Sequence, residues 1–333
     1  MMAPVRQGGI LAIDQGASKT QVLLADGQGS LVAAGRGPGA CWSTSGMEKA
    51  MDGLRLAMQD LVLRAEADVP PISHVVAGMS GVDWPGDEKI VQKALSSALG
   101  LDASRVHAVN DCLIALRAGT ASAAGAVLCA GTGFNCAVRN GTGEEWVFGY
   151  YVHDDCQGGS GLGIRAIQAV IDMEAGLRKQ TGLSGIVLDA MECKTPLELL
   201  RKKVEGRLRH DAVCALPRFV ETAALDGDET ANALLYQIGA DMADYAVAGL
   251  KKLKMTARET EVVLSGSLFK CRAPALCRGV QERLAQGAPL AKIRQSKLEP
   301  VVGGVLLALD ALGQAPKAAI EQEAAGFGLT RTV

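Results

Sequence analysis

The chain has 333 residues, of which 48% are hydrophobic and 21% charged, with a formal net charge of −2. A chain of this length is longer than a domain with a single hydrophobic core usually is, so two domains are expected. The composition is that of a globular protein. Acidic and basic residues are interspersed, which argues against nucleic acid or an anionic membrane as a partner. No apolar run approaches the ~18 residues that span a bilayer.

The N-terminal stretch and the cysteines bear on the cellular compartment. The stretch MMAPVRQGGILAID lacks the apolar core of a signal peptide and leads into a predicted strand. Nine cysteines are scattered singly, without a CxxC pair or the spacing of a metal site. Unpatterned cysteines of this kind usually behave as small buried hydrophobic residues in a reducing compartment. We therefore expect a cytoplasmic protein.

The first part of the chain alternates predicted strands and helices. GGILAIDQG predicts a strand, and TQVLLADGQGSLVAAGRG predicts a hairpin of two more strands around the turn DGQG. Hydrophobic periodicity then predicts, in order, a helix at 46–65, a strand at 72–81, a helix at 87–100, a strand at 105–111 and a helix at 111–121.

The second part of the chain repeats this pattern. Three strands are expected within 125–149, followed by a largely helical stretch at about 161–254, a strand at 260–270 and a final helix at 300–313. The order strand-strand-strand-helix-strand-helix-strand is therefore expected twice. We predict two mixed α/β domains of related topology with a cleft between them.

Each predicted copy has a small-residue turn between its first two strands, DQGASKT in one and GTGFN in the other. Phosphate oxygens must approach backbone N–H groups closely, so phosphate loops favour small residues. Neither turn has the P-loop pattern or a G-x-G-x-x-G that opens a helix. Either turn alone could be an ordinary β-turn, but two that face each other across a cleft favour phosphate binding.

Two aspartates end predicted strands beside these turns. Asp14 could reach Mg²⁺ with a carboxylate oxygen, or it could cap its own loop as an Asx-turn. Asp111 could accept the proton of an attacking hydroxyl, or it could be the N-cap of the following helix. The residues alone leave both alternatives open.

Six segments occur in an order and spacing typical of one family. They are AIDQGASKTQVLLADGQG, VVAGMSGVDWPGDE, VNDCLIALRAGT, VLCAGTGFNCAVRNGTGEE, VVLSGSLF and EPVVGGVLLAL. Over residues 10–313 the chain resembles the N-acetylglucosamine kinase group of the BadF/BadG/BcrA/BcrD-type ATPases, within the actin/hexokinase/Hsp70 superfamily. The set of motifs in order is specific even where each motif is weak.

This resemblance implies a fold and a domain division. The fold is α/β, with two ribonuclease H-like (actin-like ATPase) domains of duplicated βββαβαβ topology and an interdomain cleft. The first domain would span residues 1–113, and the second, with a helical insertion, residues 114–300. Residues 301–333 would form a C-terminal helix that packs back on the first domain.

The resemblance also implies roles for individual residues. ATP would be bound by Gly16, Ala17, Ser18, Lys19, Thr20, Gly131, Thr132, Gly133, Gly266 and Ser267. Asp14 would serve Mg²⁺ and Asp111 would be the general base. The substrate residues would be Trp42, Ser80, Gly81, Asn135, Asp155 and Gln157. Gly303 and Gly304 would make the contact of the connecting helix.

The presumed sugar pocket departs from the family pattern. Cys41 lies where these kinases carry an Asn, and Tyr150-Tyr151-Val152 replaces their Gly-Trp-Gly. Read without gaps, Gln157 takes the place of the sugar-binding acid, whereas a gapped alignment puts Asp154 or Asp155 there. Because the positions assigned to catalysis are kept, the departures favour an enzyme with a different acceptor substrate over a protein without catalytic activity. Trp42, Tyr150 and Tyr151 either pack in the core or provide a surface on which a sugar stacks.

The function implied is an ATP- and Mg²⁺-dependent sugar kinase that acts on an amino sugar such as glucosamine, N-acetylglucosamine or a relative. A homodimer is expected. One alternative is an ATPase of the dehydratase and reductase activator type, in which cysteines hold an iron–sulfur cluster between subunits. Only Cys156 precedes the Gln-Gly-Gly-Ser stretch, without a second cysteine at cluster-like spacing. The other alternative is a nucleotide-binding pseudokinase.

Overall fold

The computed structural model describes residues 8–65 and 69–330. These residues form two compact units, each with its own sheet and helices. Unit 1 contains the described residues up to Val127 together with those from Arg294 onward, and unit 2 is Leu128–Ile293. In the part of the chain that is described, no helix is long and apolar enough to cross a bilayer.

Unit 1 is built on a mixed five-stranded sheet with the order β3-β2-β1-β4-β5. Its strands are β1 (Gly9–Gln15), β2 (Lys19–Ala25), β3 (Leu31–Pro38), β4 (Ile72–Met79) and β5 (Val106–Asn110). The hairpins make β1 antiparallel to β2 and β2 antiparallel to β3, whereas β4 and β5 run parallel to β1. The carboxyl ends of β1, β4 and β5 therefore meet at one edge of the sheet.

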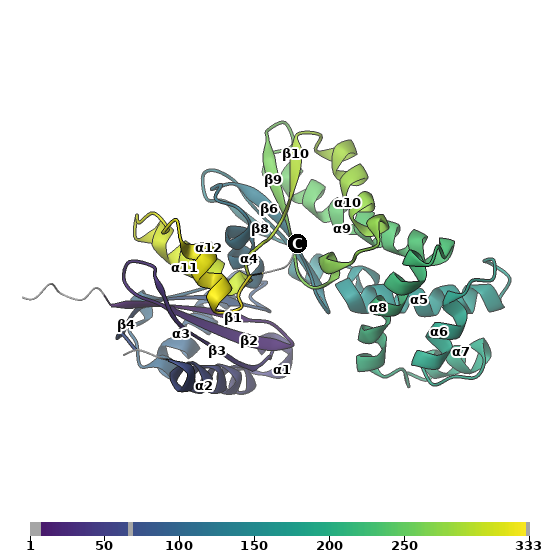
Figure 1. Cartoon of the computed structure of the whole chain (residues 1–333), viewed down its shortest axis with the longest axis horizontal. Coiled ribbons are helices and arrows are strands. Elements are labelled where there is room, and N and C mark those ends of the chain that lie inside the picture. Colours follow the sequence, from purple (N-terminus) through teal and green to yellow (C-terminus); the bar gives the residue numbers. More distant parts are fainter. Residues whose placement is uncertain (1–7, 66–68, 331–333) are drawn as a thin grey trace, which may run out of the picture. The chain divides into compact units, whose positions relative to one another are not determined.

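Helices cover both faces of this sheet (Figure 1). They are α1 (Trp42–Ser45), α2 (Met47–Arg64), α3 (Asp87–Leu99), α4 (Asp111–Gly119), α11 (Pro300–Ala311) and α12 (Ile320–Gly326). β1 lies at the centre of the sheet and is buried along its whole length. Ile10 and Ala12 pack with α11, while Leu11 and Ile13 pack with α2 and α3. A central strand buried on both faces requires such a continuous apolar run.

α4 and α11 cross closely on one face of the sheet. A Cβ atom at Gly303 would overlap the backbone oxygen of Ile114 in α4. Arg117 of α4 and Asp310 of α11 also form an ion pair at 2.6 Å. Because of this packing, α4 and the residues just after it belong to unit 1.

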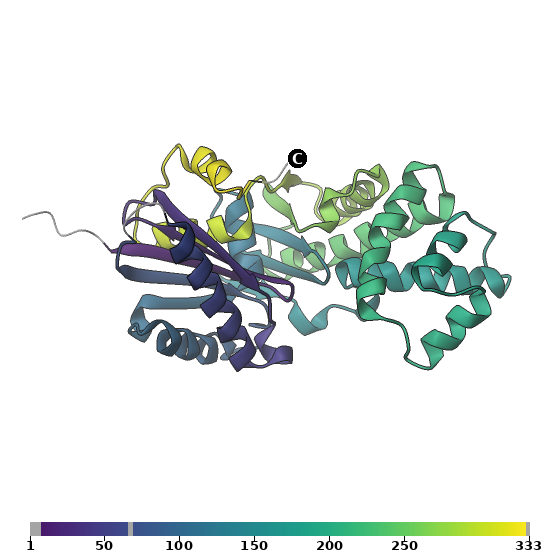
Figure 2. The ribbon, with the colours of Figure 1, turned by 60° about the horizontal axis from the view of Figure 1, so that its bottom comes forward.

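Unit 2 repeats the sheet of unit 1, with the order β10-β9-β6-β7-β8. Its strands are β6 (Gly125–Ala130), β7 (Phe134–Arg139), β8 (Glu145–Val147), β9 (Thr260–Ser265) and β10 (Ala291–Gln295). Its helices are α5 (Gly158–Glu174), α6 (Leu183–Ala190), α7 (Pro196–Val204), α8 (His210–Leu225), α9 (Glu229–Lys252) and α10 (Pro274–Gly287). Figure 2 shows α6, α7 and α8, coloured teal to green, at the end of this unit that lies away from its sheet.

The predicted α/β fold with a duplicated βββαβαβ order is confirmed. α10 and β10 complete the second copy, although the sequence patterns did not locate them. The compact units divide inside β6 and β10, rather than after residues 113 and 300 as expected. The packing of α4 on α11 moves the first division, and burial of Leu298 in the core of unit 1 moves the second.

Candidate functional site

The carboxyl edge of the unit 1 sheet gathers the acids that the sequence singled out. Asp14 lies within β1, opposite Gly78 of β4, and is only 6% exposed. Asp111 begins α4 directly after β5, and Met79 at the end of β4 pairs with Asn110. Asp14 precedes the turn as a strand residue. The parallel register brings the ends of these three strands together.

Asn110, not Asp111, is the N-cap of α4. The Asn110 side chain accepts a hydrogen bond from the backbone N–H of Cys112 at 3.0 Å. Its Nδ2 donates to the backbone oxygen of Val82 at 3.0 Å and to Oδ1 of Asp83 at 2.9 Å. Capping is therefore performed by the preceding residue, which leaves the Asp111 carboxyl for another role.

The Asp111 carboxyl has a strongly shifted titration. Burial, together with the smaller effects of the negative charges of Asp14 and Asp83, raises its pKa to about 7. Its place in the first turn of α4 and the nearby Cys112 N–H oppose this shift only in part. The residue keeps some exposed surface. A carboxyl with such a pKa can exchange protons at neutral pH.

The hairpin between β1 and β2 is tight and presents backbone amides. The N–H of Gly16 donates to the backbone oxygen of Lys19 at 3.0 Å, while Ala17 and Ser18 are exposed. The hairpin also packs against β3, because a Cβ atom at Gly39 would overlap the Lys19 nitrogen. Thr20 differs from the rest of the predicted loop, since it is fully buried and its hydroxyl donates to Pro38 O at 2.8 Å.

Lys19 is held by two residues that the sequence analysis did not identify. Its Nζ donates to Oε1 of Gln21 at 2.5 Å and to Oε2 of Glu299 at 3.0 Å. Glu299 is the N-cap residue of α11 and is 9% exposed, whereas the Lys19 side chain is 48% exposed. The ammonium group therefore lies at the mouth of the hairpin, within the same unit as Asp14 and Asp111.

The predicted substrate residues of unit 1 lie together. Gly81 has a φ of +86°, and a Cβ atom there would come within 2.6 Å of Ser43 Oγ and 2.8 Å of Cys41 Sγ. Ser80 donates its backbone N–H to Gln15 O at 2.9 Å. Among the residues described, Ser80 Oγ, Trp42 Nε1 and Gln15 Oε1 are buried without a hydrogen-bond partner. Orphaned polar atoms of this kind are costly, so this patch favours a polar ligand or water.

The hairpin of unit 2 is fixed to the start of α5. The N–H groups of Gly159 and Ser160 donate to the backbone oxygens of Gly131 and Thr132, at 2.8 and 2.9 Å. Gly158 has a φ of +53°, and a Cβ atom there would overlap Gly133 O. The loop oxygens thus turn toward α5, while Thr132 and Gly133 are exposed.

The structure brings Gly266 and Ser267, two of the predicted ATP-binding residues, to this same hairpin. Gly266 has a φ of +104°, and a Cβ atom there would overlap Ala130 O just before the turn. Ser267 Oγ lies 3.9 Å from the position of a Cβ atom at Gly131. Gly266 and the exposed Ser267 therefore border this hairpin from the β9 side.

Two predicted substrate residues of unit 2 bind backbone groups of the same unit. Gln157 accepts from the Phe134 N–H at 3.3 Å and donates to Val152 O at 3.4 Å. Asn135 accepts from the backbone N–H groups of Cys136 and Gly149, at 2.8 and 2.9 Å. These contacts support the hairpin whether or not a substrate is present.

The acids and tyrosines before α5 are exposed. Asp155 pairs with Arg165 at 3.2 Å, and Arg165 also pairs with Asp241 at 2.6 Å. Asp154 is exposed as well. Tyr150 and Tyr151 are 53% and 62% exposed, so neither is a core residue.

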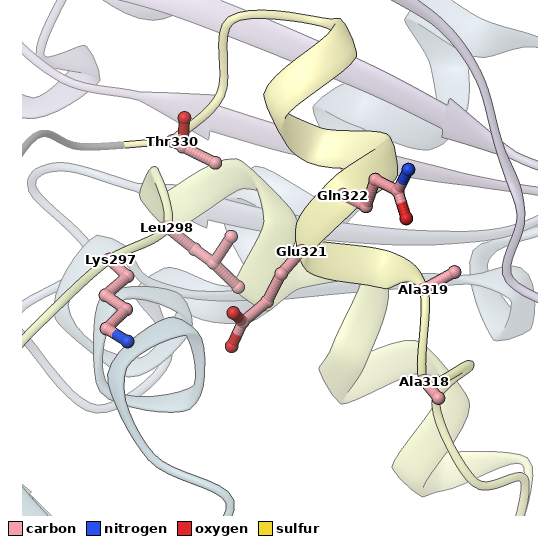
Figure 3. Close-up of a pocket in the computed structure, with 7 residues that line it drawn as sticks. All are labelled: Lys297, Leu298, Ala318, Ala319, Glu321, Gln322 and Thr330. Atoms are coloured by element: carbon pink, nitrogen blue, oxygen red, sulfur yellow. The ribbon is translucent and has the colours of Figure 1, made fainter.

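A cavity of about 530 Å³ lies beside α12 in unit 1 (Figure 3). It is lined by Lys297, Leu298, Ala318, Ala319, Glu321, Gln322 and Thr330. None of its lining residues belongs to the predicted site. In the described part of the chain, no cluster of three or more His, Cys, Asp or Glu residues could hold a metal ion by itself.

Comparison with known proteins assigns the chain to a family. The family model described as the BadF/BadG/BcrA/BcrD ATPase family matches residues 11–308, and the chain therefore belongs to that family. The chain is also similar to the N-acetylmuramic acid/N-acetylglucosamine kinase of Clostridium acetobutylicum. The two are 24% identical over 306 residues, which cover 90% of this chain and 97% of the relative.

Two solved structures share the fold. A proposed N-acetylglucosamine kinase from Chromobacterium violaceum superimposes with a TM-score of 0.69 at 23% identity, covering 90% of this chain and 98% of that one. A second, from Porphyromonas gingivalis, has a TM-score of 0.66 at 19% identity, covering 90% and 99%. At such identities the likeness defines the fold alone.

Proposed function

We propose that this protein is an ATP- and Mg²⁺-dependent sugar kinase whose acceptor is an amino sugar such as glucosamine, N-acetylglucosamine or a relative. The observation that carries the proposal is the place of Asp111, which follows β5 at the sheet edge where β1, with Asp14, and β4 also end. Burial there raises its pKa to about 7, which suits a general base at neutral pH. Membership of an ATPase family and a relative that is a sugar kinase support it.

Asp111 would accept the proton of the acceptor hydroxyl as that oxygen attacks the terminal phosphate of ATP. Such proton transfer typically contributes ~10²–10⁴ in rate. The rest of phosphoryl transfer depends on positioning and on neutralising charge. The exposed backbone of Ala17, Ser18, Thr132 and Gly133 would supply amides to the phosphates, and the Lys19 ammonium would supply positive charge.

The residues present fit a magnesium ion that is shared with the nucleotide. Asp14 offers a hard carboxylate oxygen beside the hairpin, and Mg²⁺ usually keeps several waters and binds one or two carboxylates plus phosphates. Since no described cluster of three ligands exists, phosphates and water would complete the shell. When bound, the ion would neutralise charge on the transferred group.

The acceptor preference is proposed from the departures in the sugar pocket. Because both ends of the Gln157 side chain contact backbone groups, Gln157 is less suited to select a sugar than an acid would be. The exposed Asp154 and Asp155 remain candidates for binding a cationic amine. We therefore expect higher kcat/KM for glucosamine than for N-acetylglucosamine.

The proposal includes a cytoplasmic homodimer. The nine cysteines, which occur as free thiols, support a reducing compartment. The mass in solution, measured by light scattering, tests the dimer.

The central experiment measures ATP-dependent phosphorylation of N-acetylglucosamine, glucosamine and glucose side by side. Glucosamine should be the best of the three, and Asp154→Asn or Asp155→Asn should reduce that advantage. Asp14→Ala is the matched control for the metal, and it should lose Mg²⁺-dependent turnover while keeping its Tm.

Each alternative has its own outcome in this experiment. Efficient phosphorylation of N-acetylglucosamine would show that the pocket departures are neutral. ATP binding without turnover on any sugar would favour a pseudokinase. An Asp14→Ala protein with normal turnover at limiting Mg²⁺ would remove Asp14 from the metal site.

A further inference from the structure

The loop between β4 and α3 in unit 1 carries an exposed tryptophan that the proposed mechanism does not use. Trp84 is 56% exposed, although a large aromatic side chain gains much free energy from burial. It directly follows Asp83, one of the acids that raise the pKa of Asp111. An exposed indole at this place is a candidate for contact with a ligand.

The backbone around Trp84 is held firmly. Oδ2 of Asp87, a residue only 8% exposed, accepts from the N–H of Asp83 at 3.1 Å and from the N–H of Trp84 at 2.8 Å. The Asp87 N–H in turn donates to the Trp84 oxygen at 3.1 Å. The indole is therefore presented from a fixed segment, which lowers the entropy that ordering it would cost.

The same loop is joined to the proposed general base. Nδ2 of Asn110 donates to Val82 O at 3.0 Å and to Asp83 Oδ1 at 2.9 Å, and Asn110 immediately precedes Asp111. Trp84 therefore directly follows Asp83, whose side chain accepts a hydrogen bond from the N-cap residue of α4. A sugar whose hydroxyl reaches Asp111 comes near this loop.

We propose that Trp84 is a platform for the acceptor, on which the apolar C–H face of a pyranose ring stacks while one hydroxyl points to Asp111. This inference rests on the proposed sugar kinase function. Sites for small ligands combine aromatic walls with a few placed polar groups, and here the indole provides the wall and the acids provide the polar groups. The platform selects for a pyranose with a continuous apolar face.

The test combines kinetics with tryptophan fluorescence in the full-length protein. Trp84→Ala should raise KM for the acceptor tenfold or more, with kcat and KM for ATP within about threefold of the wild type. Trp84→Phe keeps an aromatic face and should restore most of the acceptor affinity. Ile90→Ala is the matched control, because Ile90 is 54% exposed on the neighbouring helix and should leave all constants unchanged.

Fluorescence gives a readout that does not depend on turnover. The acceptor should change the tryptophan emission of the wild type, and this change should be clearly smaller in Trp84→Phe, where only Trp42 and Trp146 still report. A Trp84→Ala protein with wild-type acceptor KM would overturn the platform alone. A Trp84→Ala protein that loses Tm and ATP affinity together with acceptor affinity would also overturn it, because such losses indicate that Trp84 supports the packing of the unit. A wild type that phosphorylates no sugar would overturn both proposals.

Discussion

At the residue scale, the titration of Asp111 decides how the proposed base behaves near neutral pH. Burial, followed by the charges of Asp14 and Asp83, raises its pKa to about 7. A general base must be ionised to accept a proton, so kcat/KM for the acceptor should rise about tenfold per pH unit below the pKa of Asp111 and level off above it. Mg²⁺ at Asp14 offsets one of the charges that raise this pKa, so the levelling should come below pH 7 in the ternary complex. Initial rates across this range measure the profile.

Asp111→Asn is the control for this prediction, because it keeps the shape and removes the proton acceptor. It should lower kcat by ~10² or more with little change in nucleotide affinity. The raised pKa also means that the folded state loses stability as pH rises from about 4 to 7. Asp111→Asn should therefore raise Tm at pH 8 but not at pH 4. Wild-type turnover in this variant would exclude Asp111 as the base.

The sequence predicts the acids and hairpins of the candidate site better than the side chains that hold them. Asp14, Asp111 and the small-residue turns follow apolar runs, so local pattern locates them. Lys19 and Glu299 are 280 positions apart, and Asp83 and Asn110 are 27 apart. Contacts over such separations depend on the sheet order, which the local pattern does not contain. The exposed Trp84 was missed for the same reason.

At the element scale, strands and helices with a strong hydrophobic pattern were predicted, whereas those with a weak pattern were missed. β1 was predicted because its apolar run ends in a small-residue turn. β10 was missed because its residues are mostly exposed and alternate weakly. The predicted helical stretch at 161–254 is five helices, α5–α9, and one of them contains Pro217 within its span. Their ends depend on caps such as Asp228, which accepts from the Ala231 N–H.

The crossing of α4 and α11 gives a prediction for Gly303. Gly303→Ala places a methyl group against Ile114 O, so α11 must move away from α4. Overpacking of this kind typically costs about 1–3 kcal/mol, and Tm should fall by several degrees. Gly326→Ala in α12 is the matched control, because nothing lies within 4 Å of its new methyl group. An unchanged Tm for Gly303→Ala would contradict the close crossing.

At the scale of the whole molecule, duplication explains why two hairpins carry similar residues. The β1–β2 turn and the β6–β7 turn occupy equivalent places in two sheets of the same strand order. The copies differ after their third strands, where unit 1 has two helices and unit 2 has five. The duplicated topology was predictable from repeated element types, whereas the unit boundaries depend on the packing of α4, α11 and Leu298.

The cysteines of the whole chain bear on the alternative function, an ATPase that drives electron transfer. An iron–sulfur cluster shared between subunits needs thiolates that are accessible at a surface. Cys156 is 2% exposed, and burial raises its pKa to about 12. Burial also raises the pKa of Cys271 to about 11 and raises that of Cys277. The burial of Cys156 therefore argues against a cluster that this residue shares with a second subunit.

Protein purified without oxygen from iron-replete cells should therefore be colourless, with iron and acid-labile sulfide far below one atom per chain. Absorption spectra and metal analysis of the same sample measure this. Stoichiometric iron with a brown colour would contradict the expectation and revive the electron-transfer ATPase. In that case Cys156→Ser should lose the iron, whereas Cys193→Ser, which changes a cysteine that is also buried, should keep it.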